Sequence, residues 1–138
     1  MPKTARDDLA IIDAHHHLWN LQTGDYPWLS TDHDAPFRYG DTAPLKHNYL
    51  YNDFRRDAAN QNVVKSVHME AEWNTADPVA ESRWLTAYAA DHDLPSAIVA
   101  QAWLDRDDVE AVLTAQAGFD LVRGVRQKPW AAPTADDF

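Results

Sequence analysis

The sequence of 138 residues contains no cysteine, which excludes a disulfide framework, a thiolate metal site and a thiol nucleophile. Basic residues are also scarce, because 12 Lys and Arg stand against 22 Asp and Glu, for a net charge of -10. This balance argues against nucleic acid and an anionic membrane surface as partners, since both attract clustered cations. No apolar run is long enough to span a membrane, and the N-terminus lacks the apolar core of a signal peptide. We therefore expect a soluble, cytoplasmic protein.

Glycine is nearly as scarce, with 4 residues in the chain. The sequence has no glycine-rich phosphate loop, no Gly-x-Gly-x-x-Gly and no Gly-x-Ser-x-Gly, so nucleotide-binding and serine-hydrolase hypotheses have no support. The hydrophobic content of 45% and the aromatic content of 11% are too high for a disordered chain. No linker or internal repeat divides the sequence, so we treat 1–138 as a single unit.

Short apolar runs alternate with amphipathic segments along the chain. The predicted strands are 9–14, 63–71, 96–103 and 121–126. Predicted helices cover 48–60, a segment starting at Asp77-Pro78, and a segment that is opened by Asp105 and Asp107–Asp108 and closed by Gly118. A long, aromatic-rich loop over 19–47 is expected to be ordered and packed. Alternating strands and helices predict an α/β fold with a parallel sheet, either a doubly wound open sheet or a (β/α) barrel.

The strand patterns also predict which faces are covered. The first strand has no polar alternation, which indicates burial on both faces. In the second strand the period of two places the apolar residues on one face and Ser66, His68 and Glu70 on the other. Buried polar groups need partners, so we expect this polar face to line a water-filled site, with Glu70 as the best candidate near the strand end. The alternative is a strand with one solvated face.

His15 and His17 form the clearest chemical motif. They lie two residues apart at the end of the first strand, so both imidazoles point to the same side. In a parallel α/β fold, sites are built at the carboxyl ends of strands, and two adjacent imidazoles can hold a divalent metal or polarise one substrate oxygen. The alternative is a surface histidine cluster. His16 points the other way and is expected to be structural.

Arg126 ends the fourth predicted strand. A guanidinium at a strand end is suited to bidentate capture of a carboxylate, although an ordinary surface salt bridge explains it equally well in so acidic a chain.

The segment 11–19, which contains Asp13-Ala14-His15-His16-His17, resembles the first strand of the amidohydrolase-related family. The similarity is to the amidohydrolase 2 type, in the branch of L-fuconolactonase-like and pyrone-dicarboxylate lactonase-like enzymes. Similar blocks follow in the same order at 26–29, 67–72, 77–85 and 122–127. Together they cover the chain from about Ile11 to Trp130.

This resemblance implies a (β/α)8 barrel and the hydrolysis of a sugar lactone or a carboxylated lactone. Water would attack a carbonyl that is polarised by His15 and His17 as the catalytic pair. The same two histidines would be the metal ligands if Zn or Mn is bound, and some members of the branch work without a metal. Glu70, His68 and Arg126 would contact a small-molecule substrate. A metal-dependent decarboxylase of the same superfamily is an alternative.

A barrel of this kind needs about 250 residues, and this chain supplies only about the first four βα units. The family's remaining site residues, a histidine after the fifth strand and an aspartate at the eighth, have no counterpart here. We therefore expect 1–138 to be the N-terminal half of one barrel domain, incomplete for catalysis by itself. Its open edges would pair with a second copy of the chain or with a separate C-terminal half. A non-catalytic half-barrel that binds a partner is the remaining alternative.

Overall fold

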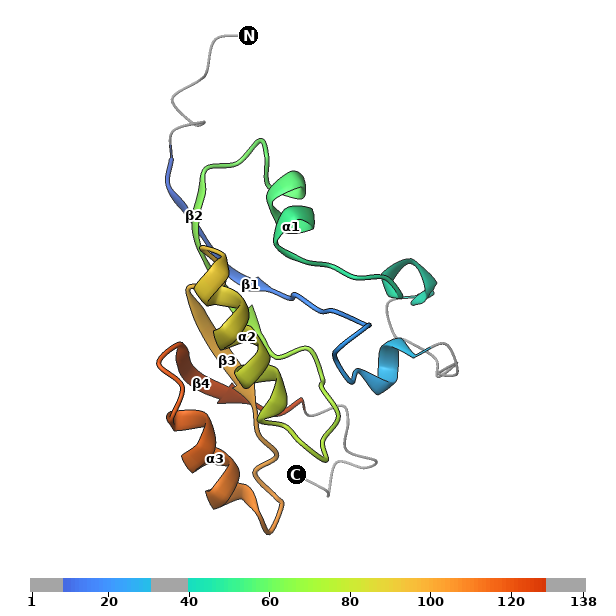
Figure 1. Cartoon of the computed structure of the whole chain (residues 1–138), viewed down its shortest axis with the longest axis vertical. Helices are drawn as coiled ribbons and strands as arrows, with labels where there is room; N and C mark the ends of the chain where they lie inside the picture. Colours follow the sequence, from blue (N-terminus) through green and yellow to red (C-terminus); the bar gives the residue numbers. More distant parts are fainter. Residues whose placement is uncertain (1–8, 31–39, 129–138) are drawn as a thin grey trace, which may run out of the picture.

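A computed structural model describes residues 9–30 and 40–128 of the chain, and the statements below concern this part. The expectations for the N-terminus and for Trp130 lie outside the described residues. The strands are β1 (Ile11–His16), β2 (Val63–Met69), β3 (Ala97–Gln101) and β4 (Val122–Arg126), and the α-helices are α1 (Tyr51–Asp57), α2 (Ala80–Asp91) and α3 (Val109–Ala117). Short 3-10 turns occupy Pro27–Leu29 and Ala43–Leu45. Figure 1 shows these elements along the chain.

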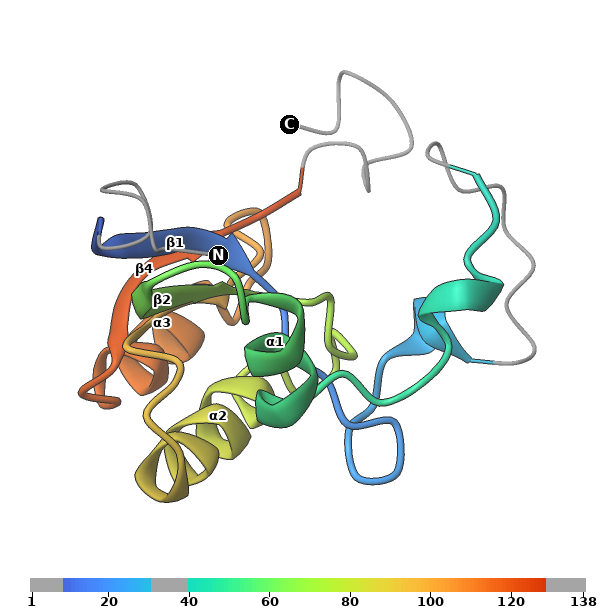
Figure 2. The ribbon, with the colours of Figure 1, turned by 90° about the horizontal axis from the view of Figure 1, so that it is seen from above.

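The four strands form one parallel sheet in the order β1-β2-β3-β4. Each strand therefore pairs with the next one in the sequence, and the order never reverses. Figure 2 shows α1, α2 and α3 on the same face of this sheet. A doubly wound sheet has a reversal of strand order and helices on both faces, whereas a (β/α) barrel has neither. The described residues therefore show a parallel α/β sheet whose winding is consistent with a (β/α) barrel.

A continuous apolar core lies between the sheet and its helices. Its buried members come from the chain after β1, from α1 and α2, from the segment between α2 and β3, and from β3, namely Leu18, Phe54, Leu85, Leu94, Ile98 and Ala100. A second cluster joins the aromatic loop to the segment after β2 through Trp19, Tyr26, Leu29, Ala71 and Trp73. The described part of the long loop is thus packed, as its aromatic content predicts.

The prediction that the first strand is buried on both faces is wrong for this chain. Ile12 is 59% exposed, and Leu9, just before β1, is 66% exposed. The reason is that α1, α2 and α3 all lie on one face of the sheet, so no described helix covers the other face of β1. In addition, β1 forms one edge of the sheet and pairs only with β2 in the described residues. An edge strand lacks a neighbour to cover its outer side.

The predicted alternation of polar and apolar residues in β2 is correct. The prediction that the polar face lines a water-filled site is wrong for Ser66 and His68. Ser66 and His68 are both 0% exposed, and His68 bonds to Glu81 on α2, so this polar face looks toward the helices. The half-buried Val67 and Met69 look toward the opposite, uncovered face. Burial of polar groups under a helix requires a partner on that helix, which no pattern within β2 reveals.

The helices are shorter than predicted. The predicted cap Asp77-Pro78 forms a turn before α2, in which Ala80 N donates to Asp77 O over 3.1 Å. Asp108 is the N-cap of α3, and Gly118 follows its last residue. Across the described ranges, the helices are all too short or too polar to cross a membrane.

Candidate functional site

The carboxyl ends of all four strands lie along one rim of the sheet and bring several of the predicted site residues there. His15 lies near the end of β1, Glu70 directly follows β2, and Gln101 and Arg126 end β3 and β4. Gln101 and Arg126 are paired in register, so their side chains leave the sheet on the same side. This is the edge at which barrel enzymes carry their sites.

His15 and His17 converge as their spacing predicts. Their Nε2 atoms lie 3.3 Å apart, and their rings meet edge to face with centroids 5.1 Å apart. His17 Nδ1 lies 2.8 Å from Met69 O, and because a carbonyl only accepts, Nδ1 must carry the proton. His17 Nε2 therefore presents a lone pair to His15. In this arrangement His15 Nε2–H donates to His17 Nε2.

The environment of His17 keeps its ring neutral. Burial lowers the pKa of His17 to about 3, and the nearby His68, His15 and Arg126 contribute in the same direction. Coordination of a metal through Nε2 requires this uncharged form. His16 instead points toward α1, where its ring packs on Phe54 with centroids 4.6 Å apart, in agreement with the structural role expected for it.

His68 lies beneath this pair rather than on the open side. Leu18 N donates to His68 Nδ1 over 3.1 Å, so the ring proton sits on Nε2 and is donated to Glu81 Oε1 at 3.2 Å. Burial lowers the pKa of His68 to about 3. With both nitrogens engaged and no exposed surface, His68 is placed to hold the end of β1, and the structure does not bring it to the open rim with the other predicted residues.

Glu81 on α2 is the partner that the strand pattern did not reveal. Its Oε1 accepts from His68 and also from Ala71 N at 3.0 Å, so one buried carboxyl ties α2 to the chain after β2. Burial raises the pKa of Glu81 to about 8. The helical periodicity offered a signal, because Glu81 lies four residues before the buried Leu85 and thus on the apolar side of α2.

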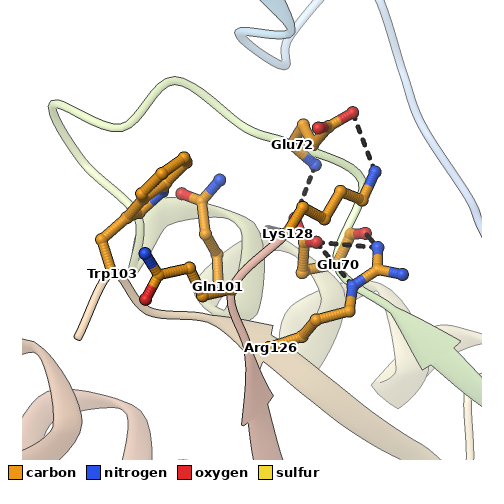
Figure 3. Close-up of a pocket in the computed structure, with 7 residues that line it drawn as sticks. Glu70, Glu72, Gln101, Trp103, Arg126 and Lys128 are labelled. Carbon is orange, nitrogen blue, oxygen red and sulfur yellow. Dashed lines mark hydrogen bonds and ion pairs between the residues drawn. The ribbon is translucent and has the colours of Figure 1, made fainter. Parts of the chain in front are cut away.

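Glu70 and Arg126 form a nearly buried ion pair across the rim (Figure 3). Arg126 Nε and Nη2 both reach Glu70 Oε1 at 2.7 Å, and Nη2 also donates to Glu70 O at 2.6 Å. Burial raises the pKa of Glu70 to about 7, against the opposing effect of Arg126. These contacts leave the Nη1 donors of Arg126 outside the pair.

A second ion pair, Lys128 Nζ to Glu72 Oε2 at 2.8 Å, lies beside the first. Glu72 has a φ of 57°, a left-handed conformation that is uncommon outside glycine, and its N–H donates to Glu70 Oε2 at 2.8 Å. The turn after β2 is thus shaped around the Glu70 carboxylate. Neither Glu72 nor Lys128 was predicted as a site residue from the sequence.

The histidine pair fits a divalent metal as two ligands of an incomplete set. Two imidazole nitrogens on one tetrahedral Zn²⁺ lie about 3.3 Å apart, which follows from Zn–N bonds of about 2.0 Å. The separation observed between the Nε2 atoms is 3.3 Å, and His17 Nδ1 makes the backbone contact typical of metal-binding histidines. Within residues 9–30 and 40–128, however, no group of three or more His, Asp or Glu side chains converges to complete a site.

Comparisons with known proteins agree with the fold. No family model matches the sequence. A curated relative, the uncharacterized protein y4mH of Sinorhizobium fredii, is 42% identical over 120 residues, covering 87% of this chain and 40% of the relative. An amidohydrolase from Burkholderia multivorans with bound zinc aligns with a TM-score of 0.59 at 23% identity, over 91% of this chain and 39% of that protein. Amidohydrolase 2 from Bifidobacterium longum subsp. infantis aligns at 0.53 and 24% identity, over 70% of this chain and 34% of that protein.

These likenesses establish a shared fold: the described residues form a mixed α/β unit with a parallel four-stranded sheet, as the aligned parts of these two structures do. The chain spans only 40% of the length of the curated relative that it matches.

Proposed function

We propose that this chain is the N-terminal part of an amidohydrolase-type hydrolase that cleaves the carbon–oxygen bond of a lactone. One observation carries the proposal: the Nε2 atoms of His15 and His17 converge at 3.3 Å on the strand edge where barrel sites are built. The neighbouring amidohydrolase structures support the superfamily. We further propose that the substrate is a sugar lactone or a carboxylated lactone.

In this proposal the two histidines take different roles. His15 turns its Nε2–H from His17 Nε2 to the carbonyl of the substrate and stabilises the oxyanion that forms during water attack. His17, whose Nδ1–H is held by Met69 O, accepts through Nε2 a hydrogen bond from the attacking water. A divalent cation such as Zn or Mn held by the two Nε2 atoms would supply Lewis-acid polarisation and a more acidic water. Arg126 offers its remaining Nη1 donors to the substrate, and Glu70 holds the guanidinium in place.

The proposal requires chain that lies beyond the described half of the barrel. The carboxylates of the described rim are already engaged: Glu70 and Glu72 are ion-paired, and Glu81 is buried under the sheet. Asp13 accepts a hydrogen bond from His15 N at 3.1 Å. We propose that the remaining strands of the barrel bring the general base and complete the ligand set. We therefore expect the 138-residue chain alone to hydrolyse a lactone only slowly.

A second function is favoured by the exposed apolar side chains and the open edges of the sheet. Ile12 and Val64 are 59% and 51% exposed, and β1 and β4 each lack a second neighbour among the described strands. A half-barrel with such edges is suited to bind a second copy of itself or a separate C-terminal half, without chemistry of its own.

A complementation assay tests the hydrolase. The chain is mixed with the part of the Sinorhizobium relative that follows the matched segment, and lactone opening is followed by proton release with and without Zn²⁺. We expect hydrolysis that His15→Ala and His17→Ala abolish. His92→Ala is the matched control, because His92 stacks on Tyr88 in α2, with centroids 4.0 Å apart, and should leave the rate unchanged.

Zinc binding by the chain alone provides a separate readout. His15→Ala and His17→Ala should each lose the zinc-induced shift of the histidine ring signals, and His92→Ala should retain it. A soluble complex of the two halves that opens no lactone, under either metal condition, would overturn the hydrolase in favour of the binding function.

A further inference from the structure

A small pocket lies beside the Glu70–Arg126 pair at the carboxyl ends of β2, β3 and β4 (Figure 3). On its β3 side stand Gln101 and Trp103, which the sequence did not single out as site residues. Gln101 is 3% exposed, and its Nε2 donates to Trp73 O at 3.0 Å, which directs Oε1 away from that carbonyl. Gln101 Oε1 and Trp103 Nε1 are both buried, and neither has a hydrogen-bond partner within the described part of the chain.

Two orphaned polar atoms of opposite type in one pocket need an explanation, since buried polar groups are almost always paired. Gln101 Oε1 accepts only, and the indole Nε1–H of Trp103 donates only. A hydroxyl group can satisfy both, because it donates one hydrogen bond and accepts others. The cavity measures about 10 Å³, close to the volume that one water-sized group occupies.

The charges around the pocket favour a neutral group. Arg126 is paired with Glu70, and Lys128 is paired with Glu72, both at 2.7 to 2.8 Å. The two cations and two anions therefore balance, and each cation already has a carboxylate. An additional carboxylate would have to compete with Glu70 or Glu72 and would leave one of them without its partner.

We propose that Gln101 and Trp103 form a subsite for one neutral hydroxyl group of the substrate. The hydroxyl donates to Gln101 Oε1 and accepts from Trp103 Nε1. Arg126, paired in register with Gln101, borders the same pocket from β4. This subsite rests on the proposed function, and it specifies which lactones the site prefers: those with a ring hydroxyl in reach, ahead of those with a carboxylate.

The test uses the 138-residue chain and three lactones that share a carbonyl. Galactonolactone carries hydroxyls, butyrolactone carries none, and butyrolactone carboxylate carries an anion. Each is titrated to its solubility limit while the Trp103 indole N–H and the Gln101 side-chain amide are followed by ¹H–¹⁵N NMR. We expect galactonolactone to shift both signals and to bind more tightly than the other two.

Trp103→Phe removes the donor and keeps an aromatic ring. It should weaken galactonolactone binding about fivefold, the loss of one neutral hydrogen bond, and leave butyrolactone binding unchanged. Trp84→Phe in α2 is the matched control and should change neither. Equal binding of all three lactones, or the same affinity in Trp103→Phe, would overturn the subsite and leave the pocket to a structural water.

The outcomes separate this proposal from the hydrolase. Lactone opening in the complementation assay without a preference for hydroxylated lactones contradicts the subsite alone. A hydroxyl-dependent shift at Trp103 without lactone opening contradicts the hydrolase and supports the subsite as a binding site.

Discussion

The two ends of the sheet are built in opposite ways. At the carboxyl end several polar side chains are buried: His68, Glu70 and Gln101 are 0%, 1% and 3% exposed. At the amino end large apolar side chains are exposed, with Ile12 at 59% and Val64 at 51%. A folded domain normally has the reverse distribution. The polar end is thus held by specific hydrogen bonds and ion pairs, while the apolar end has no cover within the described chain.

The two ends therefore differ in how much each side chain contributes to the free energy of unfolding of the described chain. Each buried polar group at the carboxyl end depends on one identified partner, so removing that partner leaves a costly unpaired atom. An exposed apolar side chain buries little surface on folding, so shortening it changes the free energy of unfolding only slightly.

The largest effect is expected for Glu81→Ala. The change leaves Ala71 N–H and His68 Nε2–H buried without their acceptor, which should lower the free energy of unfolding by about 3 kcal/mol. Urea unfolding monitored by tryptophan fluorescence measures it. Glu81→Gln is the matched control, because it retains a carbonyl acceptor and should lose about 1 kcal/mol or less. Equal losses would show that the ionisable carboxyl itself, and not an acceptor of the same shape, matters.

The same control also has a pH signature. The pKa of Glu81 is raised from 4.5 to about 8, so the folded state holds a proton that the unfolded state releases between these values. This group's contribution to stability is therefore full below about pH 4.5 and is lost as the pH rises toward about 8. Glu81→Gln cannot titrate, so its stability relative to the wild type should improve across that window. A constant difference would contradict the raised pKa.

A smaller loss is expected for Arg126→Ala. It leaves the carboxylate of Glu70, whose side chain is 2% exposed, without its cation, and the 22% exposure of Arg126 moderates the effect to about 2 kcal/mol. Thermal unfolding checks this loss. The surface residue Arg56, with a side chain 67% exposed, provides the control, and Arg56→Ala should not change the melting temperature measurably. A double variant, Arg126→Ala with Glu70→Leu, should recover part of the loss, and no recovery would argue against an unpaired carboxylate as its cause.

The smallest effect is expected at the apolar end. Ile12→Val should change the free energy of unfolding by less than about 0.5 kcal/mol, because the side chain is 59% exposed. Ile98→Val makes the same change at a side chain that is 1% exposed and should cost about 1 kcal/mol. Equal losses at the two isoleucines, measured by urea unfolding, would mean that the amino end is covered in solution and would remove the contrast between the two ends.

Local patterns predicted much of the fold. The four strands were located within a few residues, and the His15–His17 pair was placed on one side of β1, because the strand period of two is a property of the backbone. The direction of the polar face of β2 was predicted wrongly, since alternation names two faces and does not say which one a helix will cover. Gln101 and Trp103 gave no signal because an amide and an indole at a strand end are ordinary residues until their neighbours are known.

The sequence by itself determined the alternation of strands and helices, the parallel sheet and the histidine motif, all of which follow from spacing over a few residues. Only the tertiary structure decided that the helices share one face of the sheet, that Glu81 accepts a hydrogen bond from His68 and that Arg126 pairs with Glu70. Glu70 and Arg126 are 56 residues apart, and their contact depends on how β2, β3 and β4 pair in register. Such long-range pairings arise from the collective packing of the sheet, which no local pattern encodes.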